Sequence, residues 1–355
     1  MDGITDERKW RLVLLTGLLI FVAGFYWHVL QAPDRVLLND YGDGLKNYYT
    51  LLWNANLDAP LLHYTGSNFP FGESVFYTDG HPLLSWLLRP FPGLAAHGVG
   101  VLNLLLFLGL IACGLCLYEL LRILRVTPWA AAIGAFSITL LQPQAFRLTG
   151  HFSLAHAWMI PLFMLLSVRV YRAGIMGWRP MLWAALAVFV AYLTHAYMGL
   201  MGTMLLLAFG CSHYVLGGFR RSSLRIFFTR TLPAAVIPML GFLLLLWLSD
   251  TATGRPSGNM GADRFATHFL NLIVPLGDPF KTPLKGFINY DKLEWEAWCY
   301  LGLSSILVLV IAAGLQLHRW STRQPAKPTD EAGYLLAGSF LLLLFAMGVW
   351  QDRLG

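Results

Sequence analysis

The chain has 355 residues, of which 57% are hydrophobic and only 12% are charged, and its formal net charge is +6. A soluble domain carries about twice that charged fraction. The chain therefore has too few polar side chains to coat a water-soluble body, and lipid has to replace water around much of it. Its basic residues are spread over short connections between apolar runs, which excludes a nucleic acid as partner. We expect an all-α polytopic membrane protein whose first partner is the lipid bilayer.

Apolar runs predict about nine transmembrane helices. They cover residues 12–30, 99–121, 128–146, 152–170, 181–194, 196–217, 231–249, 298–317 and 334–350. His195 falls between two of the shorter runs, where we expect a tight reversal. Short spans that meet at a polar reversal suggest a water-filled cavity, because irregular backbone inside a bilayer must line water or protein.

The orientation follows from lysine and arginine. Every second connection is rich in these residues, beginning with Arg8, Lys9 and Arg11 before the first span, and the intervening connections are balanced or acidic. The positive-inside rule therefore predicts a cytoplasmic N-terminus. The first apolar run is too long for the core of a cleaved signal peptide, so we interpret it as a retained anchor.

The same topology predicts one transmembrane domain over residues 1–350, with long external loops at 31–98 and 250–297. Long ordered loops in a compact protein are typically functional. A short tail at 351–355 follows the last apolar run, from which we expect a chain shortened at its C-terminus.

The first external loop begins with two aspartates, Asp40 and Asp43, in a glycine-rich turn. After the turn, apolar and aromatic residues recur at helical spacing from Leu45 to Trp53, which predicts an amphipathic helix at the membrane interface. Asp43 would then lie near the N-terminus of this helix. It is either a helix cap or a functional carboxylate, and Asp40 is either a solvated turn residue or a second acid.

Other ionisable residues lie later in this loop and at the ends of apolar segments. His81 follows Asp79 in a polar turn before a short apolar helix that we expect at residues 82–91. Arg147 and His151 are four residues apart, but Gly150 interrupts the helix, so we expect them to line an external turn. Charged or titratable groups at membrane depth usually face a cavity or a partner. The alternative for each histidine, including His195, is a neutral structural residue held by hydrogen bonds.

Three stretches carry a resemblance to a known family. They are the segment from Asn39 to Tyr49, the segment Gly150-His151-Phe152-Ser153-Leu154-Ala155-His156-Ala157-Trp158, and Trp298-Cys299-Tyr300-Leu301-Gly302. With the cytoplasmic N-terminus and the large first external loop, they resemble the GT-C superfamily of membrane glycosyltransferases. That superfamily includes oligosaccharyltransferases, protein O-mannosyltransferases and aminoarabinose transferases, and the closest likeness is to a poorly characterised bacterial branch.

The resemblance implies a GT-C-like fold in the bacterial inner (plasma) membrane and a role in building the cell envelope. It implies transfer of a sugar from a polyprenyl-phosphate-linked donor to an unknown acceptor on the non-cytoplasmic face. Asp43 would be the general base, with Asp40 as second candidate. The candidates for binding the donor phosphate or the substrate are Lys46, Arg147, His151, His195, His81 and Arg264.

No organic cofactor is expected. Many members of the superfamily carry a second acidic motif near the start of the fourth span, whereas this chain offers Arg147 and His151 there. A divalent metal is therefore not supported, and we expect no metal ligands.

Two other functions fit the same sequence features. A transporter or flippase for a lipid-linked or amphiphilic substrate would place ionisable residues near the bilayer midplane and have two related halves. A non-catalytic membrane scaffold would leave Asp43 exposed with no cavity behind it.

Overall fold

The computed structural model describes residues 2–56, 60–250, 269–275, 281–290 and 331–346, together with 301–302, 305–307, 310–311 and 314. The chain divides into two compact units, Met1–Thr253 and Gly254–Gly355. The boundary falls within the predicted second external loop.

The first unit is built almost entirely from helices. Its long helices are α1 (Asp2–Phe25), α6 (Gly98–Ile123), α7 (Pro128–Leu141), α9 (Met159–Ala173), α10 (Trp178–Thr194), α11 (Ala196–Leu216) and α13 (Leu232–Ser249). Its short helices are α2 (Trp27–Gln31), α3 (Gly42–Asn56), α4 (Pro82–Leu88), α5 (Pro92–Ala95), α8 (Pro143–Phe146) and α12 (Arg221–Ile226). Single helical turns lie at η1 (Val75–Tyr77), η2 (Arg147–Thr149), η3 (Phe152–Leu154) and η4 (Phe227–Thr231). The all-α class is thereby confirmed.

Four helical stretches in the described part of the chain are long and apolar enough to cross a membrane. They are Gly98–Ile123, Phe152–Ala173, Ala196–Leu216 and Arg221–Ser249. They coincide with four of the nine predicted spans and support a membrane protein. Shorter apolar helices cover Pro128–Leu141, Trp178–Thr194 and Glu331–Leu344, and most of the predicted span at 298–317 lies outside the described residues.

Two predicted spans are divided. The run at 12–30 ends its first helix at Phe25, and α2 begins only after Tyr26. The run at 128–146 ends its helix at Leu141, because Pro143 follows and pushes Gln142 into an extended conformation, with ψ of 152°.

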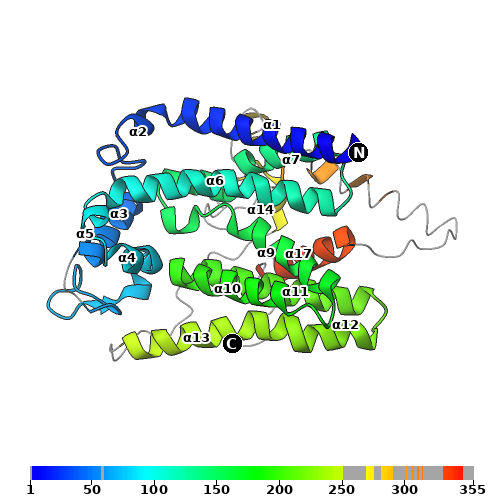
Figure 1. Cartoon of the computed structure of the whole chain (residues 1–355). Coiled ribbons are helices and arrows are strands. Elements are labelled where there is room, and N and C mark those ends of the chain that lie inside the picture. Colours follow the sequence, from blue (N-terminus) through cyan, green and yellow to red (C-terminus); the bar gives the residue numbers. More distant parts are fainter. Residues whose placement is uncertain are drawn as a thin grey trace. The chain divides into compact units, whose positions relative to one another are not determined.

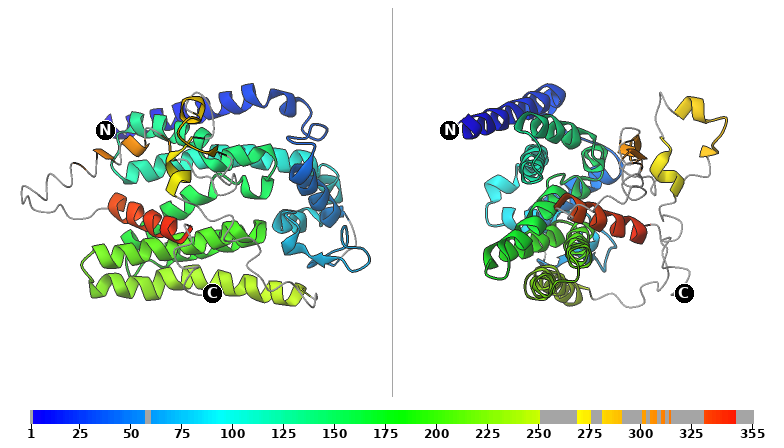
Figure 2. Two further views of the ribbon diagram at one scale, coloured as in Figure 1. Left: turned by 180° about the vertical axis from the view of Figure 1, so that it is seen from behind. Right: turned by 90° about the vertical axis from the view of Figure 1, so that its right-hand side faces the viewer.

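The helices of the first unit pack in two neighbouring groups. The first group is α1, α6 and α7, in mutual contact, and the second is α9, α10, α11 and α13. Contacts between α6 and α9 join the groups. The short helices α3, α4 and α5 gather at one end of these helices, opposite the N-terminus of α1, as the views from both sides show (Figures 1 and 2).

The first loop forms an ordered layer at that end. It contains α3, then a two-stranded antiparallel hairpin, β1 (His63–Tyr64) with β2 (Glu73–Ser74), and then α4 and α5. The predicted interfacial helix is present as α3. The predicted helix at 82–91 is present as α4, which ends at Leu88, and α5 follows beyond the predicted range.

A buried polar contact fixes this layer to the long helices. Asn103 of α6 is fully buried and donates hydrogen bonds to the carbonyls of Pro33, at 2.8 Å, and Val36, at 2.9 Å. Its side-chain oxygen accepts a hydrogen bond from the hydroxyl of Tyr48 on α3. Burial raises the pKa of Tyr48 to about 12, so this hydroxyl keeps its proton and remains a donor. Since unpaired buried polar groups are costly, these bonds hold α3 in one position.

The second unit is described in part. It contains α14 (Phe269–Ile273), α15 (Lys281–Leu284) and α17 (Glu331–Ala346). Of these, α17 carries the apolar stretch that was predicted as the last span.

Candidate functional site

Two distant segments meet at the N-terminus of α3. The side chain of Asn39 donates a hydrogen bond to the carbonyl of Thr149, and the side-chain oxygen of Asn47 accepts one from the amide of Ser153 at 3.2 Å. Gly44 permits this packing, since a Cβ there would lie 2.7 Å from the side chain of Asn39. Two of the three stretches that carried the family resemblance therefore lie side by side.

Asp43 faces His151 across this junction. Its Oδ2 lies 3.3 Å from Nδ1 of His151. The side chain of Asp43 is 48% exposed and that of His151 is 35% exposed, so the pair is open to an incoming molecule. Asp43 lies in the first turn of α3, where the helix dipole favours a negative charge.

A second carboxylate–histidine pair lies nearby in the same layer. Asp79 accepts hydrogen bonds from Nε2 of His195 at 2.9 Å and from Nζ of Lys46 at 3.0 Å. Lys46 lies three residues after Asp43 on α3, so the two side chains are neighbours on the helix surface. Burial raises the pKa of Asp79, but the bonds from His195 and Lys46 outweigh burial and hold the pKa well below its usual range. Asp79 is thus a fixed anion with both oxygens engaged.

His195 forms the predicted reversal between α10 and α11. The first helix ends at Thr194, His195 is extended, and the next helix begins at Ala196. Nδ1 of His195 accepts a hydrogen bond from the backbone amide of Tyr197 at 3.2 Å and so caps the N-terminus of α11. Nε2 must therefore carry the proton that is donated to Asp79. The histidine is buried, with only 11% of its side chain exposed, and its orientation is fixed from both sides.

The turn that presents Asp79 has an unusual backbone. Asp79 and His81 both adopt the left-handed conformation, with φ of 56° and 51°. Between them, Gly80 packs so closely on Thr50 of α3 that a Cβ would lie 2.2 Å from that side chain. Non-glycine residues in this conformation are uncommon and cluster at functional sites.

His81 and His156 form a buried pair behind this turn. Their rings meet edge to face, with centroids 5.2 Å apart. None of their four ring nitrogens reaches a hydrogen-bond partner within the described structure, although the backbone of Phe152 lies near His81. Burial lowers the pKa of His81 well below its usual value, and the neighbouring histidines His156 and His195 act in the same direction. The His81 ring is therefore neutral, and it links the turn at Asp79 to the segment that carries His151.

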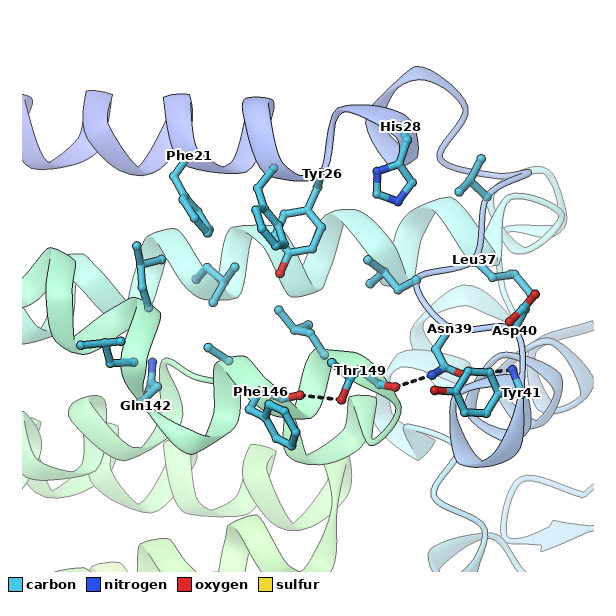
Figure 3. Close-up of a pocket in the computed structure, with 18 of the residues that line it drawn as sticks. Phe21, Tyr26, His28, Leu37, Asn39, Asp40, Tyr41, Gln142, Phe146 and Thr149 are labelled. Atoms are coloured by element: carbon cyan, nitrogen blue, oxygen red, sulfur yellow. Dashed lines mark hydrogen bonds between the residues drawn. The ribbon is translucent and has the colours of Figure 1, made fainter. Parts of the chain in front are cut away.

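A groove of about 1120 Å³ lies beside the α3 junction (Figure 3). Phe21 of α1 and Tyr26, which lies between α1 and α2, point into it. Phe146 forms part of the opposite wall, and Asp40 lies at the end away from Gln142 (Figure 3). A smaller cavity of about 420 Å³ on the other side includes Gly42, Lys46 and Tyr64 in its lining. Asp43 lines neither cavity, although Tyr41 lines the larger one and Gly42, the residue before Asp43, lines the smaller one.

The other predicted residues fall into three groups. Arg147 is half-buried at the start of η2, and its side chain makes no ion pair or hydrogen bond with the described residues. Lys46 is already paired with Asp79. Arg264 lies outside the described residues. Over the described ranges, no group of three or more histidine, cysteine or acidic side chains is placed to hold a metal ion.

Asp79 and His156 were not among the predicted site residues. A signal for Asp79 was present, because Asp79-Gly80-His81-Pro82 combines ionisable residues with a turn at the start of a helix. The sequence did not indicate the hydrogen-bond partner of Asp79, because His195 is 116 residues further along the chain.

The fold and the site define an α-helical protein with four described stretches long and apolar enough to cross a membrane and with carboxylate–histidine pairs in the layer at one end of its helices. Residues 14–349 match the family described as a domain of unknown function, DUF6311, and the chain belongs to that family. No curated protein and no solved structure matches the chain.

Proposed function

We propose that this protein is a multi-pass membrane glycosyltransferase. It transfers a sugar from a polyprenyl-phosphate-linked donor to an acceptor hydroxyl on the non-cytoplasmic face of the bacterial inner membrane. The observation that carries the proposal is the open Asp43–His151 pair, which lies beside a large groove at one end of the apolar helices.

Asp43 acts as the general base. The acceptor oxygen attacks the anomeric carbon of the sugar and gives its proton to Oδ1 or Oδ2 of Asp43, while the bond from that carbon to the phosphate oxygen breaks. The bonding electron pair leaves with the polyprenyl phosphate. His151, at 3.3 Å from the carboxylate, orients Asp43 for this transfer.

Arg147 binds the departing phosphate. A phosphate ester that leaves as an anion needs a cation or hydrogen-bond donors at that moment. The charge of Lys46 is compensated by Asp79, whereas Arg147 has no carboxylate partner among the described residues and lies four residues before His151. The planar guanidinium also matches the geometry of a phosphate group.

The groove takes the lipid part of the donor. Phe21, Phe25, Leu141 and Phe146 give it an apolar lining, and its polar end reaches Asp40. Asp43 and His151 each lie two residues beyond a lining residue, Tyr41 and Thr149. A lipid chain in the groove would thus bring its phosphosugar to the junction that holds the base.

The test is transfer of a radiolabelled sugar from a polyprenyl-phosphate donor in membranes that contain the full chain. Wild-type protein should transfer the sugar, and Asp43→Asn should lower the rate by about 100-fold or more, the typical contribution of a general base. Asp40→Asn, measured in parallel, decides whether the carboxylate that lines the groove shares this role.

Asp34→Asn is the matched control. Asp34 also pairs with a histidine in the same layer, with its Oδ2 2.8 Å from Nδ1 of His97, but it lies outside the α3 junction. Its substitution should leave transfer within a few-fold of wild type. Equal activity of Asp43→Asn and wild type would remove Asp43 from catalysis, and movement of the intact donor without sugar transfer would indicate a flippase.

A further inference from the structure

A second groove lies between α9 and α10, on a part of the molecule that the proposed reaction does not use. It has a volume of about 440 Å³. Its walls are mainly apolar, formed by Leu162 and Leu166 on α9 and by Trp183, Leu186 and Val190 on α10. The stretch that contains α9 is long and apolar enough to cross a membrane, and α10 is a shorter apolar helix beside it. An apolar groove on such helices is exposed to lipid chains rather than to water.

Two arginines close one end of this groove. Arg169 lies near the end of α9 and Arg179 in the first turn of α10, and both line the cavity. Both side chains are exposed, and neither pairs with a carboxylate among the residues described. The guanidinium of Arg179 lies over the ring of Trp178, 5.8 Å from its centroid, which favours an extended position at the groove mouth.

Two other arginines near the connection between α9 and α10 already have partners. Arg230 donates two hydrogen bonds to the carbonyl of Ile175, and Arg172 donates one to the carbonyl of Ile123 at 3.1 Å. These two arginines secure the connections between helices. Among the arginines of α9, α10 and the connection between them, Arg169 and Arg179 combine guanidinium groups that have no carboxylate partner in the described structure with a place in the lining of this cavity.

The arginine end is remote from the candidate site. The 17 residues of α10 span roughly 25 Å at 1.5 Å per residue. Arg179 begins this helix, and His195, which contacts Asp79, follows its last residue. The arginine end of the groove therefore lies at the opposite end of α10 from the layer that holds the Asp43–His151 pair, and a headgroup bound there is distinct from the sugar donor.

We propose that the α9–α10 groove binds one anionic phospholipid, with an acyl chain between the helices and the phosphate on Arg169 and Arg179. The charge of the two guanidinium groups selects a negative headgroup, and arginine binds phosphate oxygens with paired hydrogen bonds. A free phosphate would leave the apolar walls unused, and a neutral lipid would leave the arginines unpaired. This inference does not depend on the proposed glycosyltransferase activity.

The test is native mass spectrometry of the full chain in detergent, titrated with phosphatidylglycerol or with phosphatidylcholine of the same acyl chains. Wild type should retain one phosphatidylglycerol in preference to phosphatidylcholine. R169Q/R179Q should weaken that binding by about tenfold or more, since each basic residue near an anionic headgroup contributes about 1 kcal/mol. R220Q/R221Q removes the same charge from two exposed arginines that do not line the groove, and it should bind as wild type does.

A second variant tests the apolar wall with both arginines in place. Ala187 lines the groove, and Ala187→Phe should fill it and weaken phosphatidylglycerol binding while the protein still elutes as a single species. Equal losses in the two arginine double variants would overturn the proposal, because they would indicate general charge attraction. Competition by glycerol phosphate without acyl chains, at the same concentration as the lipid, would also overturn it and indicate a simple anion site.

Discussion

Two of the carboxylate–histidine pairs at the end of the helices, Asp79–His195 and Asp43–His151, differ in how completely their carboxylates are engaged. Asp79 is 34% exposed and accepts hydrogen bonds from His195 and Lys46 on its two oxygens. Asp43 is 48% exposed and faces His151 alone, at 3.3 Å. The same two residue types thus form one closed pair and one open pair within a single layer.

This difference in hydrogen bonding suits one carboxylate to a structural role and the other to proton transfer. A carboxylate whose oxygens are saturated by charged or fixed donors is a poor proton acceptor, because its pKa is lowered. A carboxylate with free lone pairs can receive a proton from a substrate. We therefore propose Asp43 as the base, and we interpret Asp79 as the group that holds α3, the turn at residues 78–81 and the α10–α11 reversal together.

Arg147 offers the largest expected effect after Asp43 itself. Arg147→Gln should lower sugar transfer by about 100-fold, since loss of one donor to a developing anion costs about that much. Arg125→Gln is the matched control, because Arg125 is an exposed arginine that does not line the groove. Initial rates at saturating acceptor measure both variants, and equal rates for the two would contradict a specific role for Arg147.

Asp79→Asn should affect stability first. It replaces two charge-assisted hydrogen bonds with weaker ones, at a cost of about 2 kcal/mol once partial exposure is taken into account. The thermal midpoint in detergent should fall. Glu73→Gln, which alters a carboxylate held by the hydroxyl of Ser67 at 2.8 Å, should lower it less. An unchanged midpoint in Asp79→Asn would show that the closed pair does not support the fold.

The smallest expected effect is on the pH dependence of protein stability, which we attribute to His81. The pKa of His81 is lower in the folded chain than its value of about 6.5 in the unfolded chain. At pH values between these two pKa values, the unfolded chain therefore binds more protons than the folded chain. Stability should therefore fall as the pH drops below about 6.5. His156 and His195 face His81 and oppose a positive charge on it, and the nearby carboxylate of Asp79 favours one.

His81→Asn should reduce this pH dependence, because asparagine tolerates the left-handed backbone and does not titrate. His63→Asn is the control, since His63 lies in the same loop but is only half-buried and is bonded to the carbonyl of Phe71 at 3.0 Å. Thermal midpoints at pH 7.5 and pH 5.5 give the comparison. A wild type with the same midpoint at both values would contradict the buried neutral imidazole.

Most helices could be predicted from the sequence, and the places where prediction was wrong have local causes. Continuous apolar character predicted unbroken spans at 12–30 and 128–146. Pro143 was visible in the second run and ends its helix. The interruption at Tyr26 follows no proline and was not visible in the hydrophobic pattern.

The candidate site could be predicted as a set of residues but not as contacts. Asp43 and His151 were both named, yet they are 108 residues apart and only the packing of α3 against η3 brings them together. Lys46 and His195 were expected to bind substrate, whereas the structure pairs both with Asp79. Pairing of this kind depends on tertiary structure, which residue spacing within one sequence does not encode.

The most direct test measures sugar transfer and thermal midpoint for Asp43→Asn and Asp79→Asn in the same preparation of membranes. The open-pair account predicts that Asp43→Asn loses transfer and keeps the wild-type midpoint, while Asp79→Asn lowers the midpoint. Transfer that survives in Asp43→Asn, with the wild type active, would contradict the assignment of the base.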